Sequence, residues 1–178
     1  PPVVGEKKKT NTAAQVRTRA FAIQYACLLF SGIAVYVSFV FLPVYASHVG
    51  ASRVEAAEIV GYIGASSVVG RLGLDALASR FGLMRMYQTG YIFLLISFFV
   101  WLRANTYAEL VIFALVMGVG YGGIAAMSPA VAASIFGIEG LGELLGILFT
   151  GFGIACLVGP PLAGALVDHL HAYKCPVV

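Results

Sequence analysis

Residues 110–138 read LVIFALVMGVGYGGIAAMSPAVAASIFGI, and no charged side chain occurs between Glu109 and Glu139. A helix needs about 20 apolar residues to cross the hydrocarbon core of a bilayer. The run is long enough for one crossing, and it lacks the polar-apolar alternation of strands in a membrane β-barrel. This stretch therefore predicts a transmembrane α-helix.

Similar apolar runs lie on both sides of this stretch, and charged residues bound each of them. Together they predict five transmembrane helices, over 20–47, 58–78, 86–102, 109–139 and 143–168. The residues after Asp168 are too few for a sixth crossing at a rise of ~1.5 Å per residue. The predicted fold class is therefore an all-α integral membrane protein.

The composition also indicates a membrane protein. Of the 178 residues, 60% are hydrophobic and only 11% are charged, whereas about 25% of an ordinary soluble domain is charged. Such a surface would aggregate in water, so a soluble enzyme and a nucleic-acid-binding protein are excluded. We expect the lipid bilayer as surroundings, no catalytic residues and no cofactor. The spacing of His169, His171 and Cys175 is too loose for a metal site.

The positive charges gather on one side of the predicted helices. If residues 1–18 are cytoplasmic, that side holds most of the 11 Lys and Arg residues, as the positive-inside rule requires. These residues are Lys7, Lys8, Lys9, Arg17, Arg19, Arg71, Arg80 and Arg85, against Arg53, Arg103 and Lys174 on the opposite side. We therefore expect a cytoplasmic basic loop segment over 1–18, a transmembrane bundle over 19–178, and cytoplasmic connections at 79–85 and 137–142.

The segment 70–85, GRLGLDALASRFGLMR, is the most informative connection. Arg71 and Asp75 are four residues apart, so they share a helix face and can form an ion pair. Arg71 lies about two turns inside the membrane edge expected at Ser79, where an unpaired charge is costly. Two interpretations stay open. Arg71, Asp75 and Arg80 clamp the ends of neighbouring helices, or Arg71 binds a substrate carboxylate through two parallel hydrogen bonds.

Glycine and proline residues predict how the helices pack. The run Gly118-Val119-Gly120-Tyr121-Gly122-Gly123 matches a dinucleotide-binding pattern, but that pattern requires a soluble βαβ unit. Inside an uncharged run it instead predicts close helix packing through Gly118 and Gly122. The pair Gly142 and Gly146 predicts a second contact of this kind.

Helix ends and bends are also visible in the sequence. Ser52 and Glu55 have the spacing of a capping box that opens the second helix. Pro129 and the pair Pro160-Pro161 remove backbone donors and predict kinks or breaks. Such helices are either bent packing helices or the broken helices found at transporter gates.

Several segments of the sequence resemble the major facilitator superfamily. That family repeats a cytoplasmic signature, G-x-x-x-D-R-x-G-R-K/R, between its second and third helices, with a weaker copy between the eighth and ninth. Arg80-Phe81-Gly82 and Arg85 fit the weaker copy, whereas Ser79 replaces the signature Asp and Asp75 its first Gly. The runs 41–46, 64–71 and 159–164 also resemble the second half of such a transporter, and the Gly-Arg pair at 70–71 is most similar to the monocarboxylate-porter branch.

The resemblance covers about residues 17–170 and implies helices seven to eleven, five helices of a six-helix half bundle. The partner N-terminal half and the twelfth helix would be missing, and we expect the chain to begin in an internal loop. The implied function is secondary active transport of a small organic anion, a proton-coupled monocarboxylate, by alternating access in the cell (inner or plasma) membrane. A non-transporting sensor or scaffold and a drug or sugar porter are the alternatives.

The resemblance also implies roles for single residues. In monocarboxylate porters an arginine of the eighth helix binds the substrate carboxylate, and Arg71 matches that position. Those carriers often place an Asp one turn earlier, where Ser67 stands here. In this superfamily the seventh, eighth, tenth and eleventh helices line the central path, so Tyr36 and Tyr121 are expected substrate-path residues. The expected gate or structural residues are Asp75, Arg80, Gly82 and Arg85.

Overall fold

The computed structural model describes residues 12–170, without the side chains of Ala13 and residues 166–170. This part is all helical, which confirms the predicted fold class. The helices are α1 (Thr12–Val16), α2 (Arg19–His48), α3 (Arg53–Phe81), α4 (Leu83–Arg103), α5 (Tyr107–Phe136) and α6 (Leu141–Leu170). The lysines at 7–9 and the side chains of His169, His171 and Cys175 lie outside the described residues.

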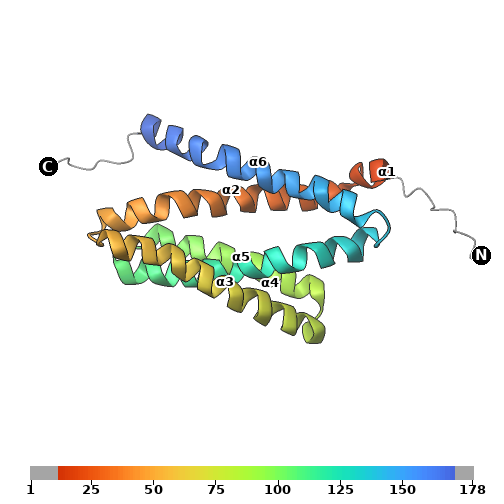
Figure 1. Ribbon diagram of the computed structural model, residues 1–178, viewed down its shortest axis with the longest axis horizontal. Coiled ribbons are helices and arrows are strands. Elements are labelled where there is room, and N and C mark those ends of the chain that lie inside the picture. The colour runs from red at the N-terminus through yellow and green to blue at the C-terminus, as the bar shows by residue number, and fades with distance from the viewer. Residues whose placement is uncertain (1–11, 171–178) are drawn as a thin grey trace, which may run out of the picture.

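The long helices form two layers (Figure 1). Helices α2 and α6 lie side by side in one layer, and α3, α4 and α5 form the other. The α3–α4 and α5–α6 turns lie at the end of the bundle where α1 lies, and the α2–α3 and α4–α5 turns lie at the opposite end. We call the latter the α2–α3 end. This arrangement agrees with the predicted alternation of connections, and which end is cytoplasmic stays a prediction.

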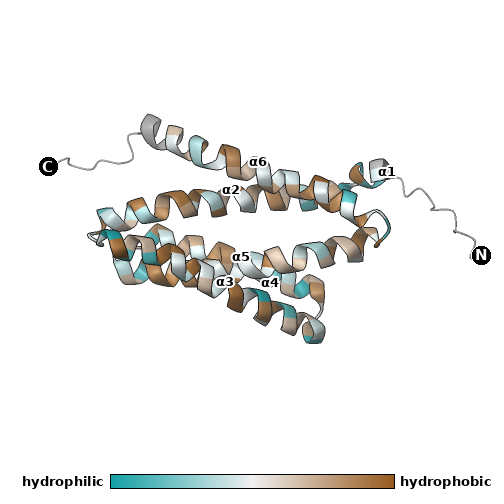
Figure 2. Ribbon diagram, in the orientation of Figure 1, coloured by the Kyte–Doolittle hydropathy of each residue, from teal (hydrophilic) through white to brown (hydrophobic). Residues whose placement is uncertain are grey.

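Within residues 12–170, four helices are long and apolar enough to cross a membrane: Arg19–His48, Leu83–Arg103, Tyr107–Phe136 and Leu141–Ala165. Figure 2 shows their hydrophobic character, with hydrophilic residues more frequent toward the turns. Helix α3 has 29 residues but is less hydrophobic, because charged residues such as Arg71 and Asp75 interrupt it. It packs along α5 and so belongs to the same bundle.

Local hydrogen bonds fix the helix ends. Ser52 Oγ accepts the Glu55 backbone N–H at 3.3 Å, and the Glu55 carboxylate accepts the Ser52 backbone N–H at 2.7 Å. This confirms the predicted capping box. Thr106 and Glu109 form a second box at the start of α5 that the sequence analysis missed. Gly82 joins α3 directly to α4 with a φ of 95°, a conformation that favours glycine.

The prolines do not interrupt the helices. Pro129 lies inside α5, and Pro160 and Pro161 lie inside α6, so the predicted breaks do not occur. Ser128 Oγ donates to the Ile124 carbonyl at 2.6 Å beside Pro129. Membrane helices tolerate proline where serine side chains and neighbouring helices satisfy nearby backbone groups.

Glycines bring α5 into backbone contact with its neighbours. A Cβ atom on Gly118 would overlap the Ser66 side chain, and one on Gly122 would overlap the Ser67 carbonyl oxygen. Both serines belong to α3, so the predicted contact through Gly118 and Gly122 is confirmed. Between them, Gly120 faces α4, where an added Cβ would lie 2.8 Å from the Gly90 carbonyl oxygen.

The second predicted glycine contact is wrong. Gly142 and Gly146 are exposed, and a Cβ added to either would meet nothing within 4 Å in the described part of the chain. The spacing places both glycines on one face of α6, but the neighbouring helices pack against its other faces. One such face holds Gly151, where an added Cβ would lie 3.1 Å from the Tyr25 ring.

Candidate functional site

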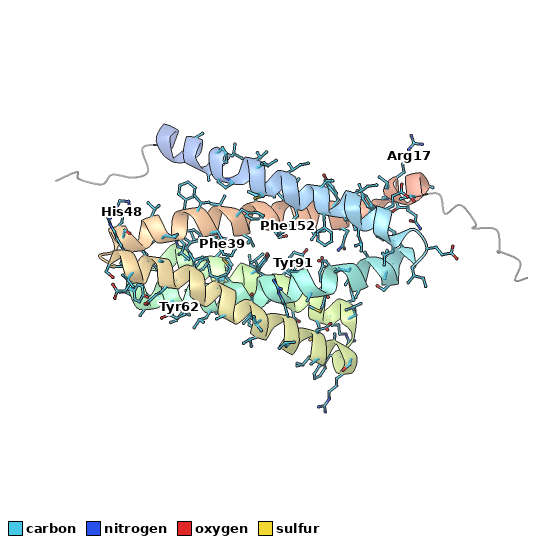
Figure 3. The ribbon with its side chains drawn as sticks, in the orientation of Figure 1. Arg17, Phe39, His48, Tyr62, Tyr91 and Phe152 are labelled. Atoms are coloured by element: carbon cyan, nitrogen blue, oxygen red, sulfur yellow. The ribbon has the colours of Figure 1, made fainter. Side chains whose placement is uncertain are left out.

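Aromatic rings from three helices meet between the two layers. The ring centroids of Tyr36 (α2) and Phe152 (α6) are 5.3 Å apart, and those of Tyr121 (α5) and Phe152 are 6.3 Å apart with nearly parallel planes. Phe39 meets the edge of Tyr121 at 6.3 Å. Figure 3 shows Phe39 and Phe152 between the layers. The structure thus brings the expected path residues Tyr36 and Tyr121 together through Phe152.

Phe152 is the residue of this cluster that sequence reasoning missed. It lies in an apolar run in which no local pattern separates it from Phe149. Its position follows from packing, because an added Cβ on Gly32 of α2 would come within 3.0 Å of the Phe152 ring. The absence of a side chain at Gly32 therefore leaves room for this ring beside Tyr36.

A small cavity of about 40 Å³ lies beside the aromatic cluster. Its walls are almost entirely apolar, and it has room for about one water molecule, which is less than an organic ion needs. The lining residues are Leu28, Ser31, Val35, Leu94, Tyr121, Ile124, Ala125, Ser128, Phe149 and Phe152. The cavity is therefore a packing gap beside the cluster, and not a chamber for a substrate.

Arg71 and Asp75 are both exposed on α3. Among the described residues no ion pair joins them, although their spacing permits one. Gly70 and Leu74 carry the contact with α5, and the two charged side chains leave the helix from the adjoining open face. An ion pair between exposed side chains gains little free energy, so their spacing alone does not enforce it. The ion-pair form of the clamp therefore lacks support in this structure.

Helix geometry places the three expected substrate residues at similar depths. With a rise of ~1.5 Å per residue, Arg71 lies about 27 Å from the start of α3, Tyr121 about 21 Å from the start of α5, and Tyr36 about 18 Å from the end of α2. All three distances are counted from the α2–α3 end of the bundle. These residues therefore occupy the middle of helices that are about 45 Å long.

Three of the four expected gate or structural residues lie around the α3–α4 turn. Arg80, Gly82 and Arg85 are all exposed there. The Arg80 guanidinium carbon is 5.8 Å from the centroid of the Phe81 ring. Asp75 lies on α3, apart from this turn. The arrangement places cations at one end of the bundle, as the resemblance implied, and their role as a gate stays a prediction.

A buried polar network links α2, α4 and α5. Gln24 Nε2 donates to the Tyr87 hydroxyl at 2.9 Å, and that hydroxyl lies 3.1 Å from the Tyr91 hydroxyl and 3.4 Å from Ser128 Oγ. Tyr91 is labelled in Figure 3. The sequence did not predict this network. Polar residues within apolar runs are the feature of the sequence that could have indicated it. Which of these polar side chains meet one another depends on how the helices pack.

The segment before α2 contacts the α5–α6 turn. Thr12 Oγ1 donates to the Glu143 carboxylate at 2.8 Å, and Gln15 Nε2 donates to the Phe136 carbonyl at 3.0 Å. Phe136 is the last residue of α5, so the Gln15 amide satisfies a carbonyl at the helix end. Helix α1 is therefore held against this end of the bundle.

Comparison with known proteins defines the family. Residues 24–174 match the family described as Major Facilitator Superfamily. The chain is 30% identical over 162 residues to Monocarboxylate transporter 3 of Mus musculus, covering 88% of this chain and 32% of the mouse protein. It is 31% identical over 147 residues to Aspyridones efflux protein apdF of Emericella nidulans, covering 82% of this chain and 30% of the fungal protein. The chain thus spans about a third of the length of these relatives.

The fold agrees with the family match. The described residues form an all-helical bundle whose apolar helices suit a multi-pass membrane protein, and the match extends over most of the chain. Members of this family are transporters and not enzymes. The chain belongs to the major facilitator superfamily of membrane transporters.

Proposed function

We propose that this chain is part of a secondary active transporter for small organic anions, with monocarboxylates as substrates and protons as the coupling ion. The observation that carries this proposal is Arg71. Arg71 lies about two thirds of the way along α3 from Arg53, and it has no ion-pair partner among the described residues. Charged side chains at membrane depth are costly and mark substrate pathways. A guanidinium binds a carboxylate through two parallel hydrogen bonds.

The relatives support two substrate classes. The match to Monocarboxylate transporter 3 favours a monocarboxylate, whereas the match to an aspyridones efflux protein favours efflux of a different product. The two identities and coverages are similar, so efflux is the second candidate. Arg71 favours the monocarboxylate, because a central guanidinium is best matched by a substrate carboxylate.

The exposed face of α3 supports a two-half mechanism. We place the described helices as the seventh to eleventh of a twelve-helix carrier, with residues 1–18 as a cytoplasmic loop. The first six helices would then form the opposite wall of a path lined by Arg71, Tyr36 and Tyr121. Rocking of one half against the other would open this path to each side in turn. The plasma membrane is the location that fits this role.

Asp75 is the proposed carboxylate for the proton-coupling step. It lies one turn from Arg71 on α3 and is exposed, so both side chains leave the helix toward the same open face. Ser67 stands one turn on the other side of Arg71, but it is buried and donates to the Gly64 carbonyl at 2.7 Å. A hydroxyl held in this way is unsuited to carry a proton between the two sides.

Uptake into proteoliposomes that contain the full-length carrier tests the proposal. With an inward proton gradient, we expect saturable uptake of a labelled small monocarboxylate. Liposomes without protein give the background from diffusion of the neutral acid. The unlabelled acid should compete, and the amide of the same size should not. Equal competition by the amide would contradict an anion site, and faster uptake of a larger neutral product would favour the efflux candidate.

A further inference from the structure

Arg53 and Arg71 lie on one face of α3. They are 18 residues apart in the sequence, which corresponds to five turns at ~3.6 residues per turn. Helix α3 contains no proline and runs without a break from Arg53 to Phe81, so this register holds along it. Between the two cations the same face carries Ala57, Val60 and Gly64, none of which is charged.

Arg53 lines an open groove between α2 and α3 at the α2–α3 end of the bundle. The groove has a volume of about 580 Å³, enough for a small organic acid. Its lining residues are Pro43, Val44, Ser47, Arg53, Ala56, Ala57 and Val60. The lining is mostly apolar, and Arg53 supplies its charge.

Helix α2 connects the groove with the aromatic cluster, because it carries residues of both. On α2, Tyr36, Pro43 and Ser47 are spaced by seven and four residues, and the helix runs through Pro43 without a break, so the three residues share about one helix face. Pro43 and Ser47 line the groove, and Tyr36 lies two turns deeper. Beyond the groove, α2 therefore carries Tyr36 and α3 carries Arg71.

Helix stability does not explain the presence of Arg53. It is the first residue of α3, directly after the Ser52 cap, where a positive charge is unfavourable with the helix dipole. Its side chain is exposed and forms no ion pair among the described residues. The Glu55 carboxylate is held by the Ser52 backbone N–H, and Glu58, five residues on, lies on a different face of the helix.

We propose that Arg53 is an anion-capture residue at the entrance of the transport path. This inference rests on the proposed function, since it takes the substrate to be a small organic anion. The Arg53 charge raises the concentration of anions in the groove, from which they pass along α3 to Arg71. Capture of this kind acts over about a Debye length, ~8 Å at physiological salt, and needs charge without a fixed geometry. Lysine can therefore replace Arg53 but cannot replace Arg71.

Initial uptake by the full-length carrier at low substrate concentration tests the capture role. Arg53→Gln should lower uptake about threefold or more at low ionic strength, and the difference should shrink as salt is added. At saturating substrate, the two rates should converge. Arg53→Lys is the matched control and should keep the wild-type rate. Equal uptake by wild type and a well-expressed Arg53→Gln protein at low salt would overturn the proposal.

A charge-reversal experiment uses a single variant. Arg53→Cys is treated with membrane-impermeant thiol reagents that differ only in the sign of their charge. The cationic adduct should restore uptake and the anionic adduct should not. Treated wild-type protein controls for the exposed native thiols of Cys27 and Cys156. Equal uptake with both adducts contradicts the capture role.

The two proposals fail differently. If Arg71→Lys abolishes transport while Arg53→Gln leaves uptake unchanged at low salt, the capture role is wrong and the anion site stands. If Arg71→Lys transports normally, the proposed function is wrong, whatever Arg53 does.

Discussion

Gly122 of α5 lies directly against the backbone carbonyl of Ser67 on α3, with no room for a Cβ between them. This contact sets the rotation of α3. Ser67 is buried, and Arg71, one turn further along, leaves the helix from the adjoining exposed face. A glycine on one helix therefore determines where the guanidinium of its neighbour lies.

The substitution Gly122→Ala should destabilise the carrier, because the added methyl group would push α3 away from α5. Overpacking of this kind costs about 1–3 kcal/mol. Gly146→Ala is the matched control, because nothing in the described chain lies within 4 Å of its added Cβ. The measurement is the thermal midpoint of both variants in detergent. Equal midpoints would contradict the close approach of the two backbones.

Tyr87→Phe should also destabilise the protein. The change leaves the buried amide of Gln24 and the hydroxyl of Ser128 without their shared partner. Hydrogen bonds between membrane helices contribute about 0.6–1.7 kcal/mol. Tyr25→Phe removes a hydroxyl from an exposed contact with Thr150 and should have a smaller effect. The thermal midpoints of the two variants test this difference in stability. A larger decrease of the midpoint in Tyr25→Phe than in Tyr87→Phe would refute it.

Phe152→Ala should weaken substrate binding in the full-length carrier. The ring links Tyr36 to Tyr121, and aromatic contacts contribute about 0.5–1.5 kcal/mol, which corresponds to about a two- to tenfold change in half-saturation. Phe30→Ala is the control, because Phe30 is 68% exposed on α2. If the Phe30 variant lost affinity and the Phe152 variant kept it, the aromatic cluster would have no part in the path.

Cysteine labelling tests which end of the bundle is cytoplasmic. Ser79→Cys lies near the α3–α4 turn and Asn105→Cys lies in the α4–α5 turn; both native residues are exposed. An impermeant thiol reagent added outside sealed cells should label position 105 and leave position 79 unlabelled. Labelling of position 79 alone would reverse the orientation inferred from the positive charges.

The sequence predicts well those features that depend on local pattern. Uncharged runs located the helices, the Ser52–Glu55 spacing located a capping box, and Gly118 with Gly122 located a helix contact. The features it missed depend on which helix lies opposite. Gly146 has the same spacing to Gly142 but faces open space.

The candidate site shows the same limit. Arg71 stands out in the sequence because it is a charge in an apolar setting, whereas Phe152 is one phenylalanine among twelve. Its meeting with Tyr36 and Tyr121 appears only once α2, α5 and α6 are packed. The absence of an ion pair between Arg71 and Asp75 has a related reason: spacing of four residues permits an ion pair, but two exposed side chains on an open face need not form it.

The most direct test of the account is the substrate affinity of Arg71→Lys in the full-length carrier, measured at normal membrane expression. Lysine keeps the charge but lacks the planar pair of donors. Loss of one charge-assisted hydrogen bond costs about 1.5–3 kcal/mol, so we expect affinity to fall about ten- to a hundredfold. Wild-type affinity in a well-expressed Arg71→Lys protein would contradict the claim that Arg71 binds the substrate carboxylate.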